Sequence, residues 1–157
     1  MSQTHRFTFN SPLGNLLIEH RNGVLEKLHF TDQEFGINES GTSVCEAEFR
    51  TALKHYFSGA AIPRNFSMNP QGSYFENEVW EAVKHIPFGE TATYKDIALQ
   101  LGKPEAARAV GRANGKNPIP LFIPCHRVIG AGEKLTGYSG GLNRKVWLLK
   151  HEGSLLI

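Results

Sequence analysis

Cysteine is scarce in this chain of 157 residues: Cys45 and Cys125 are the only two, and they lie far apart in the sequence. A disulfide-stabilised secreted domain carries more cysteines at closer spacing, so that class is excluded and both side chains are expected to be thiols. The chain also has no CxxC motif, no HExxH motif and no cluster of cysteine with histidine. We therefore expect no metal and no cofactor.

Long apolar runs are absent as well. No stretch approaches the roughly 18 apolar residues of a membrane span, and the first ten residues lack the pattern of a secretory signal. Hydrophobic residues make up 40% of the chain and charged residues 20%, which suits a packed core and excludes a disordered chain. We expect a soluble cytoplasmic protein, unattached to membranes, with one domain or two small ones.

Positive charge is concentrated in the second half. Residues 1–73 carry 6 basic and 7 acidic side chains, whereas residues 103–150 carry 9 basic and 2 acidic ones. A local excess of this kind is typical of nucleic-acid binding. On charge alone, a solvated basic face without a partner is an equally good interpretation.

The first part of the chain shows strand patterns followed by one helix. Alternating runs predict strands at 5–10, 15–20 and 24–30, and Asn22-Gly23 is a strong hairpin signal. Apolar residues recur at helical spacing over 43–58, and Cys45 is expected in the core of that helix. Irregular residues 60–72 mark a boundary, so the predicted domains are 1–72 and 73–157.

The second half carries clear helix start and stop signals. Ser73 with Glu76 and Thr93 with Asp96 each form a capping box, so each pair predicts the start of a helix. The first of these helices should end before Pro87 and the second at Gly102. Pro104 is expected at the first position of a third helix, which runs to about residue 114 and is closed by Gly115.

The elements that follow complete the prediction. The two helices that meet at Gly102 suggest a helix-turn-helix. Beyond them we expect a buried strand at 119–123, a glycine-rich loop at 130–141 and a last helix at 142–151. Lys134, Arg144 and Lys145 either touch phosphate or lie in solvent.

Small residues dominate the third predicted helix. Alanine and glycine leave a thin rod from which Arg108, Arg112 and Asn114 are expected to project. Either another helix packs tightly against this rod, or the rod lies against DNA while Arg108 reaches into the duplex. The arginines on the same element favour DNA.

The run Pro124-Cys125-His126-Arg127-Val128 carries the most specific chemical signal. A thiolate nucleophile needs a neighbour that accepts its proton, and a histidine oriented by a carboxylate can do so. Adjacent side chains on an extended strand point to opposite faces, so this chemistry requires a bend or a bridging water. An isolated pair also fits a buried cysteine beside an incidental histidine.

In its wider context this run resembles the methylated-DNA–protein-cysteine methyltransferases. The resemblance extends from Tyr94 to Glu152 and rests on the segments RAVG (108–111), AN (113–114), NP (117–118), PCHRVIG (124–130), GYSGG (137–141) and LLKHE (148–152). It implies an α+β chain with an N-terminal ribonuclease H-like sheet-and-helix domain and a C-terminal winged helix-turn-helix domain. It also implies a monomer that acts on double-stranded DNA containing O6-alkylguanine.

The resemblance assigns a chemical role to four residues. Cys125 would accept a methyl or other alkyl group from O6 of guanine, and less readily from O4 of thymine, irreversibly and once per molecule. His126 would deprotonate Cys125 through a water, and Glu152 would hold His126. Tyr94 would donate a proton or a hydrogen bond to the leaving purine after the base is flipped out.

The same resemblance assigns the DNA and base contacts. Arg108 would fill the gap left by the extruded nucleotide, and Asn117 would tie the DNA-binding helix to the strand that carries Cys125. The remaining expected contacts are Arg112 and Asn114 on the helix, and Tyr138, Ser139 and Gly140 in the pocket wall and rim.

Two other functions are compatible with part of the pattern. A DNA-binding regulator without chemistry would explain the basic stretch and the helix-turn-helix, but not the Cys-His pair. A cysteine hydrolase could use Cys125, His126 and Glu152, although the sequence shows no obvious oxyanion loop. Some relatives hold a structural zinc in the N-terminal domain, and this chain lacks those ligands.

Overall fold

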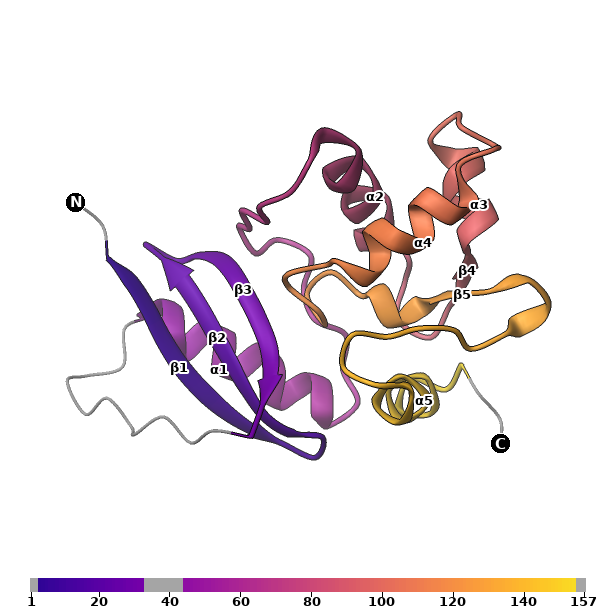
Figure 1. Cartoon of the computed structure of the whole chain (residues 1–157). Helices are drawn as coiled ribbons and strands as arrows, with labels where there is room; N and C mark the ends of the chain where they lie inside the picture. The colour runs from indigo at the N-terminus through magenta and orange to yellow at the C-terminus, as the bar shows by residue number, and fades with distance from the viewer. Residues whose placement is uncertain (1–2, 33–43, 155–157) are drawn as a thin grey trace. The chain divides into compact units, whose positions relative to one another are not determined.

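The computed structural model describes residues 3–32 and 44–154 of the chain. The chain divides into two compact units, Met1–Pro70 (unit 1) and Gln71–Ile157 (unit 2), which are coloured indigo to magenta and magenta to yellow in Figure 1. Strands and helices are both present, so the predicted α+β class is confirmed. None of the helices in the described ranges is long and apolar enough to cross a membrane.

Unit 1 contains a three-stranded antiparallel sheet in the order β1-β2-β3. Its strands are β1 (Thr4–Ser11), β2 (Gly14–Arg21) and β3 (Val24–Thr31), each within one residue of the prediction at either end. The hairpin turn at Asn22 and Gly23 is also confirmed. Both residues have positive φ values, 51° and 79°, as a two-residue type I′ turn requires.

Helix α1 (Val44–Phe57) runs along this sheet (Figure 1) and supplies Phe49, Ala52, Leu53 and Tyr56 to the unit 1 core. Its Phe49 ring stacks on Phe7 of β1 at 6.4 Å between centroids. Residue 43, where the sequence predicts the helix to begin, lies outside the described residues. The expectation that Cys45 is a core residue is wrong: it occupies the first turn of α1 and is only half-buried.

The segment after α1 returns to the sheet edge. Leu25 donates its backbone N–H to the Ser67 carbonyl at 2.9 Å, and Asn69 donates to the Leu25 carbonyl at 2.8 Å. This short parallel bridge satisfies backbone groups that an open β3 edge would leave unpaired.

Unit 2 begins with two helices whose starts follow the capping signals. In α2 (Tyr74–Lys84) and α3 (Tyr94–Gln100) the predicted capping boxes are both formed. Ser73 Oγ accepts from the Glu76 N–H, and the Glu76 carboxylate accepts in return from the Ser73 N–H. Gly102 follows α3 with φ at 72°, a conformation that favours glycine.

The third helix starts later than predicted. Helix α4 spans Ala107–Gly115, and Pro104 belongs to a preceding turn in which Ala106 N–H donates to the Lys103 carbonyl. The expectation that Pro104 opens the helix is therefore wrong, whereas the predicted end, at about residue 114 and closed by Gly115, agrees with the structure to within one residue. Helix α4 packs on α2 and α3, and buried Trp80 of α2 donates its indole N–H to the Ala113 carbonyl at 2.8 Å.

The strand predicted at 119–123 is also wrong, although these residues are buried as expected. The chain turns tightly, with Ile123 N–H donating to the Ile119 carbonyl at 2.9 Å. Leu121 has φ at 74°, and Pro120 lacks the N–H that a central strand needs. The apolar run is a buried turn instead.

A one-turn 3-10 helix, η1 (Cys125–Arg127), follows directly. It leads into β5 (Val128–Ile129), which pairs in parallel with β4 (Ala92–Thr93). After the loop that contains η2 (Ala131–Glu133), α5 (Leu142–His151) forms as predicted and packs against η1. The core of unit 2 thus surrounds the turn that carries Cys125.

Ser73→Ala removes the side-chain acceptor that caps α2 and lowers the free energy of unfolding by about 1 kcal/mol. Ser73→Thr keeps an acceptor at the same place, so it retains most of the stability. Urea unfolding followed by tryptophan fluorescence measures both, because Trp80 and Trp147 lie in unit 2. Equal losses in the two variants would show that the cap does not stabilise the helix.

Candidate active site

Cys125 is the first residue of η1 and is only 2% exposed. In a 3-10 helix successive side chains are set about 120° apart, rather than on opposite faces as in a strand. The turn therefore supplies the bend that the Cys-His sequence requires. The Cys125 N–H donates to the Ile123 carbonyl at 2.7 Å, which fixes the start of the turn.

Burial strongly favours the neutral thiol of Cys125. It raises the pKa of Cys125 from 9.0 to about 11, against smaller opposing effects from the Asn117 side chain and from the charge of Lys145. The thiolate is the nucleophilic form of cysteine. A reaction at this sulfur thus needs a group that removes the proton within the site.

His126 and Glu152 form a fully buried pair. His126 Nε2 lies 2.7 Å from Glu152 Oε2, and neither side chain is exposed. An ionised carboxylate can only accept a hydrogen bond, so Nε2 carries the proton and donates it. His126 Nδ1 is buried and has no hydrogen-bond partner among the described residues, which leaves it able to accept a proton.

Arg127 binds the same carboxylate with a two-pronged contact. Its Nε donates to Glu152 Oε1 at 2.7 Å and its Nη2 to Oε2 at 3.0 Å, while Nη1 donates to the Ile86 carbonyl. Burial opposes ionisation of Glu152, but the hydrogen bonds from His126 and Arg127 prevail and hold its pKa well below 4.5. Burial lowers the pKa of His126 below 6.5.

Two asparagines brace the chain around Cys125. Asn117 donates to the Ile123 carbonyl at 2.7 Å and accepts from the Ile119 N–H, so it stabilises the buried turn rather than a strand. Asn114 donates to the Cys125 carbonyl at 3.1 Å. The expectation that Asn114 projects from α4 is wrong, because it lies on the inner face of the helix and is 3% exposed.

Lys145 contradicts both interpretations made from the sequence. It neither lies in solvent nor can reach a DNA phosphate, because its side chain is fully buried. Nζ donates to the carbonyl oxygens of Val128 and Thr136, at 2.7 and 2.9 Å. These bonds repay the burial of the amine and join β5 to the far end of the glycine-rich loop.

A pocket of about 810 Å³ lies in unit 2, between α3, α4 and the loop after η2. Five residues expected at a DNA or base contact line it: Tyr94, Arg108, Arg112, Tyr138 and Ser139. Cys125, His126, Glu152 and Gly140 are not among its lining residues. Burial raises the pKa of Tyr138, and a negative charge on Cys125 raises it further.

From the sequence, no role was predicted for Arg127 or Thr136, and Lys145 received only the two surface interpretations that the structure contradicts. Arg127 belongs to the PCHRV run, so the sequence marked it as close to the site, but its partner Glu152 lies 25 residues further on. No sequence pattern pointed to the contacts of Lys145 and Thr136, because the fold brings their partners close. Within 3–32 and 44–154, no three His, Cys, Asp or Glu side chains lie close enough together to hold a metal ion.

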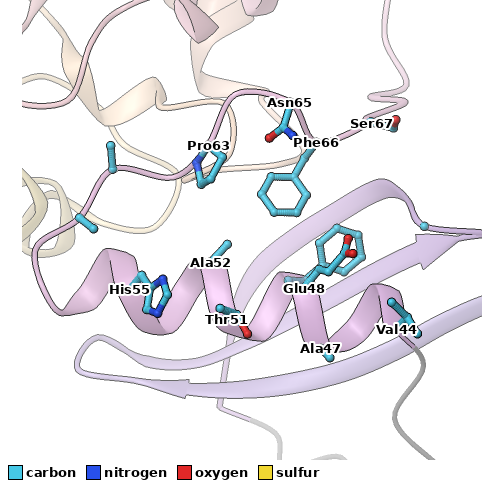
Figure 2. Close-up of a pocket in the computed structure, with 14 residues that line it drawn as sticks. Val44, Ala47, Glu48, Thr51, Ala52, His55, Pro63, Asn65, Phe66 and Ser67 are labelled. Atoms are coloured by element: carbon cyan, nitrogen blue, oxygen red, sulfur yellow. The ribbon is translucent and has the colours of Figure 1, made fainter.

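Unit 1 has a pocket of its own, of about 640 Å³. In Figure 2 side chains of α1 such as Glu48 and His55 lie on one side, and Pro63 and Phe66 of the returning segment lie on the other. Cys45 is not among its lining residues. No cysteine lines this groove among the described residues, and no histidine of its lining pairs with a buried carboxylate as His126 does with Glu152 in unit 2, so the candidate active site is that of unit 2.

Comparison with known proteins identifies what this arrangement belongs to. Residues 74–154 match the family model described as the DNA-binding domain of 6-O-methylguanine DNA methyltransferase. The chain is 45% identical to the methylated-DNA–protein-cysteine methyltransferase of Mycolicibacterium paratuberculosis, over 92% of this chain and 90% of that one. It is also 45% identical to the enzyme of that name from Methanosarcina acetivorans, over 93% and 96%.

The fold gives the same answer. The crystal structure of Mycobacterium tuberculosis OGT in complex with DNA superposes with a TM-score of 0.84 at 43% identity, covering 96% of this chain and 93% of that one. The α+β fold, with its buried cysteine beside a histidine–glutamate pair, therefore defines a class of methylated-DNA methyltransferases in which a protein cysteine is the acceptor. The chain belongs to the methylated-DNA–protein-cysteine methyltransferase family.

The lowered pKa of His126 predicts how the stability of unit 2 depends on pH. In the unfolded chain His126 titrates near its ordinary pKa of 6.5, but in the folded protein its pKa is lower. The stability due to its neutral form is complete above the unfolded-state pKa of 6.5 and is lost as the pH falls towards the folded-state pKa. Glu152, whose folded-state pKa is also depressed, adds a further loss below pH 4.5.

Urea unfolding at pH 7.5 and 5.5, followed by tryptophan fluorescence, tests this dependence. We expect unit 2 to be less stable at pH 5.5, by about 1.4 kcal/mol for each unit of pKa difference that falls in this window. His126→Gln removes the titrating group, so its loss over the same interval is smaller. An undiminished loss in that variant would contradict a neutral, buried His126.

Proposed function

We propose that this protein repairs DNA by direct reversal, moving a methyl or alkyl group from O6 of guanine to Cys125. O4 of thymine would be a poorer substrate. Transfer is irreversible and stoichiometric, because a thioether leaves no nucleophile free to release it. The observation that carries the proposal is the buried Cys125 thiol, which precedes the buried His126–Glu152 pair in a unit whose pocket is lined by Tyr94, Arg108 and Tyr138.

The proposed reaction balances with the thiol and the lesion alone. The sulfur of Cys125 attacks the methyl carbon, an S–C bond forms, and the C–O6 bond breaks with its electron pair going to the purine. The thiol proton passes to His126 Nδ1 through a water, and Glu152 stabilises the resulting imidazolium. Tyr94 stabilises the departing purine anion with a hydrogen bond or gives it a proton, and in the second case guanine leaves neutral and Tyr94 is left as a tyrosinate. The proton taken up by His126 then returns through water to the anion, so the net change is thiol plus O6-methylguanine to thioether plus guanine.

The lesion lies inside the base stack, so we infer that the nucleotide is flipped into the pocket of unit 2. Helices α3 and α4, joined at Gly102, would act as the helix-turn-helix, and the loop after β5 as the wing. Arg108 and Arg112 line the pocket and are exposed. This position suits Arg108 for filling the vacated stack and Arg112 for phosphate or base contact.

The described part of unit 1, residues 3–32 and 44–70, has no comparable site, and we propose that unit 1 supports unit 2. Its antiparallel sheet with one covering helix is compatible with the ribonuclease H-like description but does not require it. The proposal takes the acting species as a monomer in the cytoplasm. A reducing compartment suits a mechanism that needs a free thiol at Cys125.

Intact mass spectrometry after incubation with duplex DNA containing one O6-methylguanine tests the proposal. We expect one methyl group per protein molecule and no more, whatever the excess of DNA. Cys125→Ala abolishes the gain, whereas Cys45→Ser leaves it unchanged, because Cys45 lies in unit 1.

The two alternative functions predict different results in the same assay. A regulator would bind the lesion without gaining mass, and Cys125→Ala would leave its binding intact. A cysteine hydrolase would turn over an ester substrate many times without a stable methylated product. Either result would overturn the proposal.

Gly111 distinguishes the two interpretations of the thin helix. The three atoms nearest to a Cβ added at Gly111 all belong to the Tyr94 ring, and the closest is at 3.7 Å, which is ordinary van der Waals contact. Tight packing within the protein therefore does not require glycine here. Gly111→Ala should raise the free energy of unfolding by about 0.5–1 kcal/mol, since glycine is a poor helix former.

If α4 lies against DNA, the same added methyl group weakens DNA binding several-fold. Denaturation and a fluorescence titration with duplex DNA measure the two effects separately. A variant that is more stable yet binds DNA with unchanged affinity would argue against close approach of DNA at this position.

A further inference from the structure

Thr136 forms a contact across the pocket of unit 2. Its Oγ1 lies 2.9 Å from the hydroxyl of Tyr94, although the two residues are 42 positions apart. Both line the pocket, Tyr94 from α3 and Thr136 from the glycine-rich loop. The hydroxyl of the proposed proton donor is thus already held by the protein.

The backbone of Thr136 is itself fixed. Its carbonyl accepts from Nζ of Lys145, which also donates to the Val128 carbonyl, one residue beyond the turn that carries Cys125. Lys145 is fully buried, so this junction is shielded from water. The position of the Thr136 hydroxyl is therefore tied to the frame that surrounds the nucleophile.

The ring of Tyr94 faces α4 at Gly111. A Cβ built on Gly111 would lie 3.7 to 3.9 Å from the Tyr94 ring, so glycine places no side chain against the ring there. The hydrogen bond to Thr136 is therefore the contact that orients the Tyr94 hydroxyl. A phenol whose hydroxyl is already oriented loses less conformational freedom when a base enters the pocket.

We propose that Thr136 is a positioning residue that orients the Tyr94 hydroxyl for the leaving purine. A phenol oxygen both accepts and donates. When Thr136 donates to that oxygen, the proton of Tyr94 stays available for the base. This inference rests on the proposed function, because it assumes that Tyr94 assists the departure of guanine.

The test uses single-turnover rates of methyl transfer from duplex DNA containing O6-methylguanine. Thr136→Val keeps the size of the side chain and removes its hydroxyl, whereas Thr136→Ser keeps the hydroxyl and removes the methyl. We expect Thr136→Val to be about three- to tenfold slower, as for loss of one hydrogen bond. Thr136→Ser should remain within about twofold of the parent, since it restores the donor.

The effect of Thr136→Val is also measured in a Tyr94→Phe variant, which lacks the hydroxyl that Thr136 contacts. If Thr136 acts through the Tyr94 hydroxyl, Thr136→Val has no further effect once that hydroxyl is gone, so the two losses do not multiply. A loss of wall packing alone would slow Thr136→Ser as well and would persist in Tyr94→Phe. Thr136 is exposed, so its variants should melt with the parent.

Three results would overturn the inference alone: Thr136→Val as fast as the parent, Thr136→Ser as slow as Thr136→Val, or losses that multiply with Tyr94→Phe. In each of them the parent still transfers methyl, so the proposed function stands. A parent protein that transfers no methyl would defeat the proposed function, and this inference with it.

Discussion

The carboxylate of Glu152 lies just beyond the end of α5, fully buried, and binds groups from other parts of unit 2. Arg127 grips both of its oxygens and also holds the Ile86 carbonyl beyond α2, so this contact joins α5, η1 and the segment after α2. Removing one partner of a buried ion pair typically costs about 3–5 kcal/mol. The rest of the site is built on this arrangement, because it fixes the turn that carries Cys125.

The same interaction decides the protonation of the site. With its Nε2 proton committed to Glu152, His126 can accept a proton only at Nδ1. Burial favours the neutral forms of both His126 and Cys125. In the proposed reaction the proton would move from Cys125 to His126. The Asn117 side chain and the charge of Lys145 would then favour the thiolate, and Glu152 would favour the imidazolium. A resting thiol of this kind is protected from unwanted reactions with solvent electrophiles.

Local signals in the sequence predicted most of the fold. The capping boxes at Ser73 and Thr93 and the Asn22-Gly23 hairpin act over a few residues, so they can be identified without knowledge of distant contacts. The prediction that Pro104 opens the third helix was wrong because a proline that suits the first turn of a helix also suits the tight turn before it. The strand at 119–123 failed for a similar reason: buried apolar residues do not distinguish a strand from a turn, and Pro120 was the overlooked sign.

The site was predictable only where the chain itself brings residues together. Cys125 and His126 are adjacent, and the family resemblance pointed to Glu152, but no pattern places Lys145 inside the protein. A lysine on an amphipathic helix is normally exposed; here two backbone carbonyls from distant segments receive its amine. Thr136 opposite Tyr94 is likewise a product of the tertiary fold. Such residues become visible only when the loop and the helices are assembled.

Cys125 is expected to be a protonated, buried thiol in the free protein, activated within the site. Ultraviolet titration of thiolate absorbance in a Cys45→Ser background, with Cys125→Ala as the blank, measures this most directly. We expect a pKa near 11, with no thiolate at neutral pH. A thiolate already formed at neutral pH, as in cysteines whose pKa is lowered to about 3.5–7.5, would contradict it.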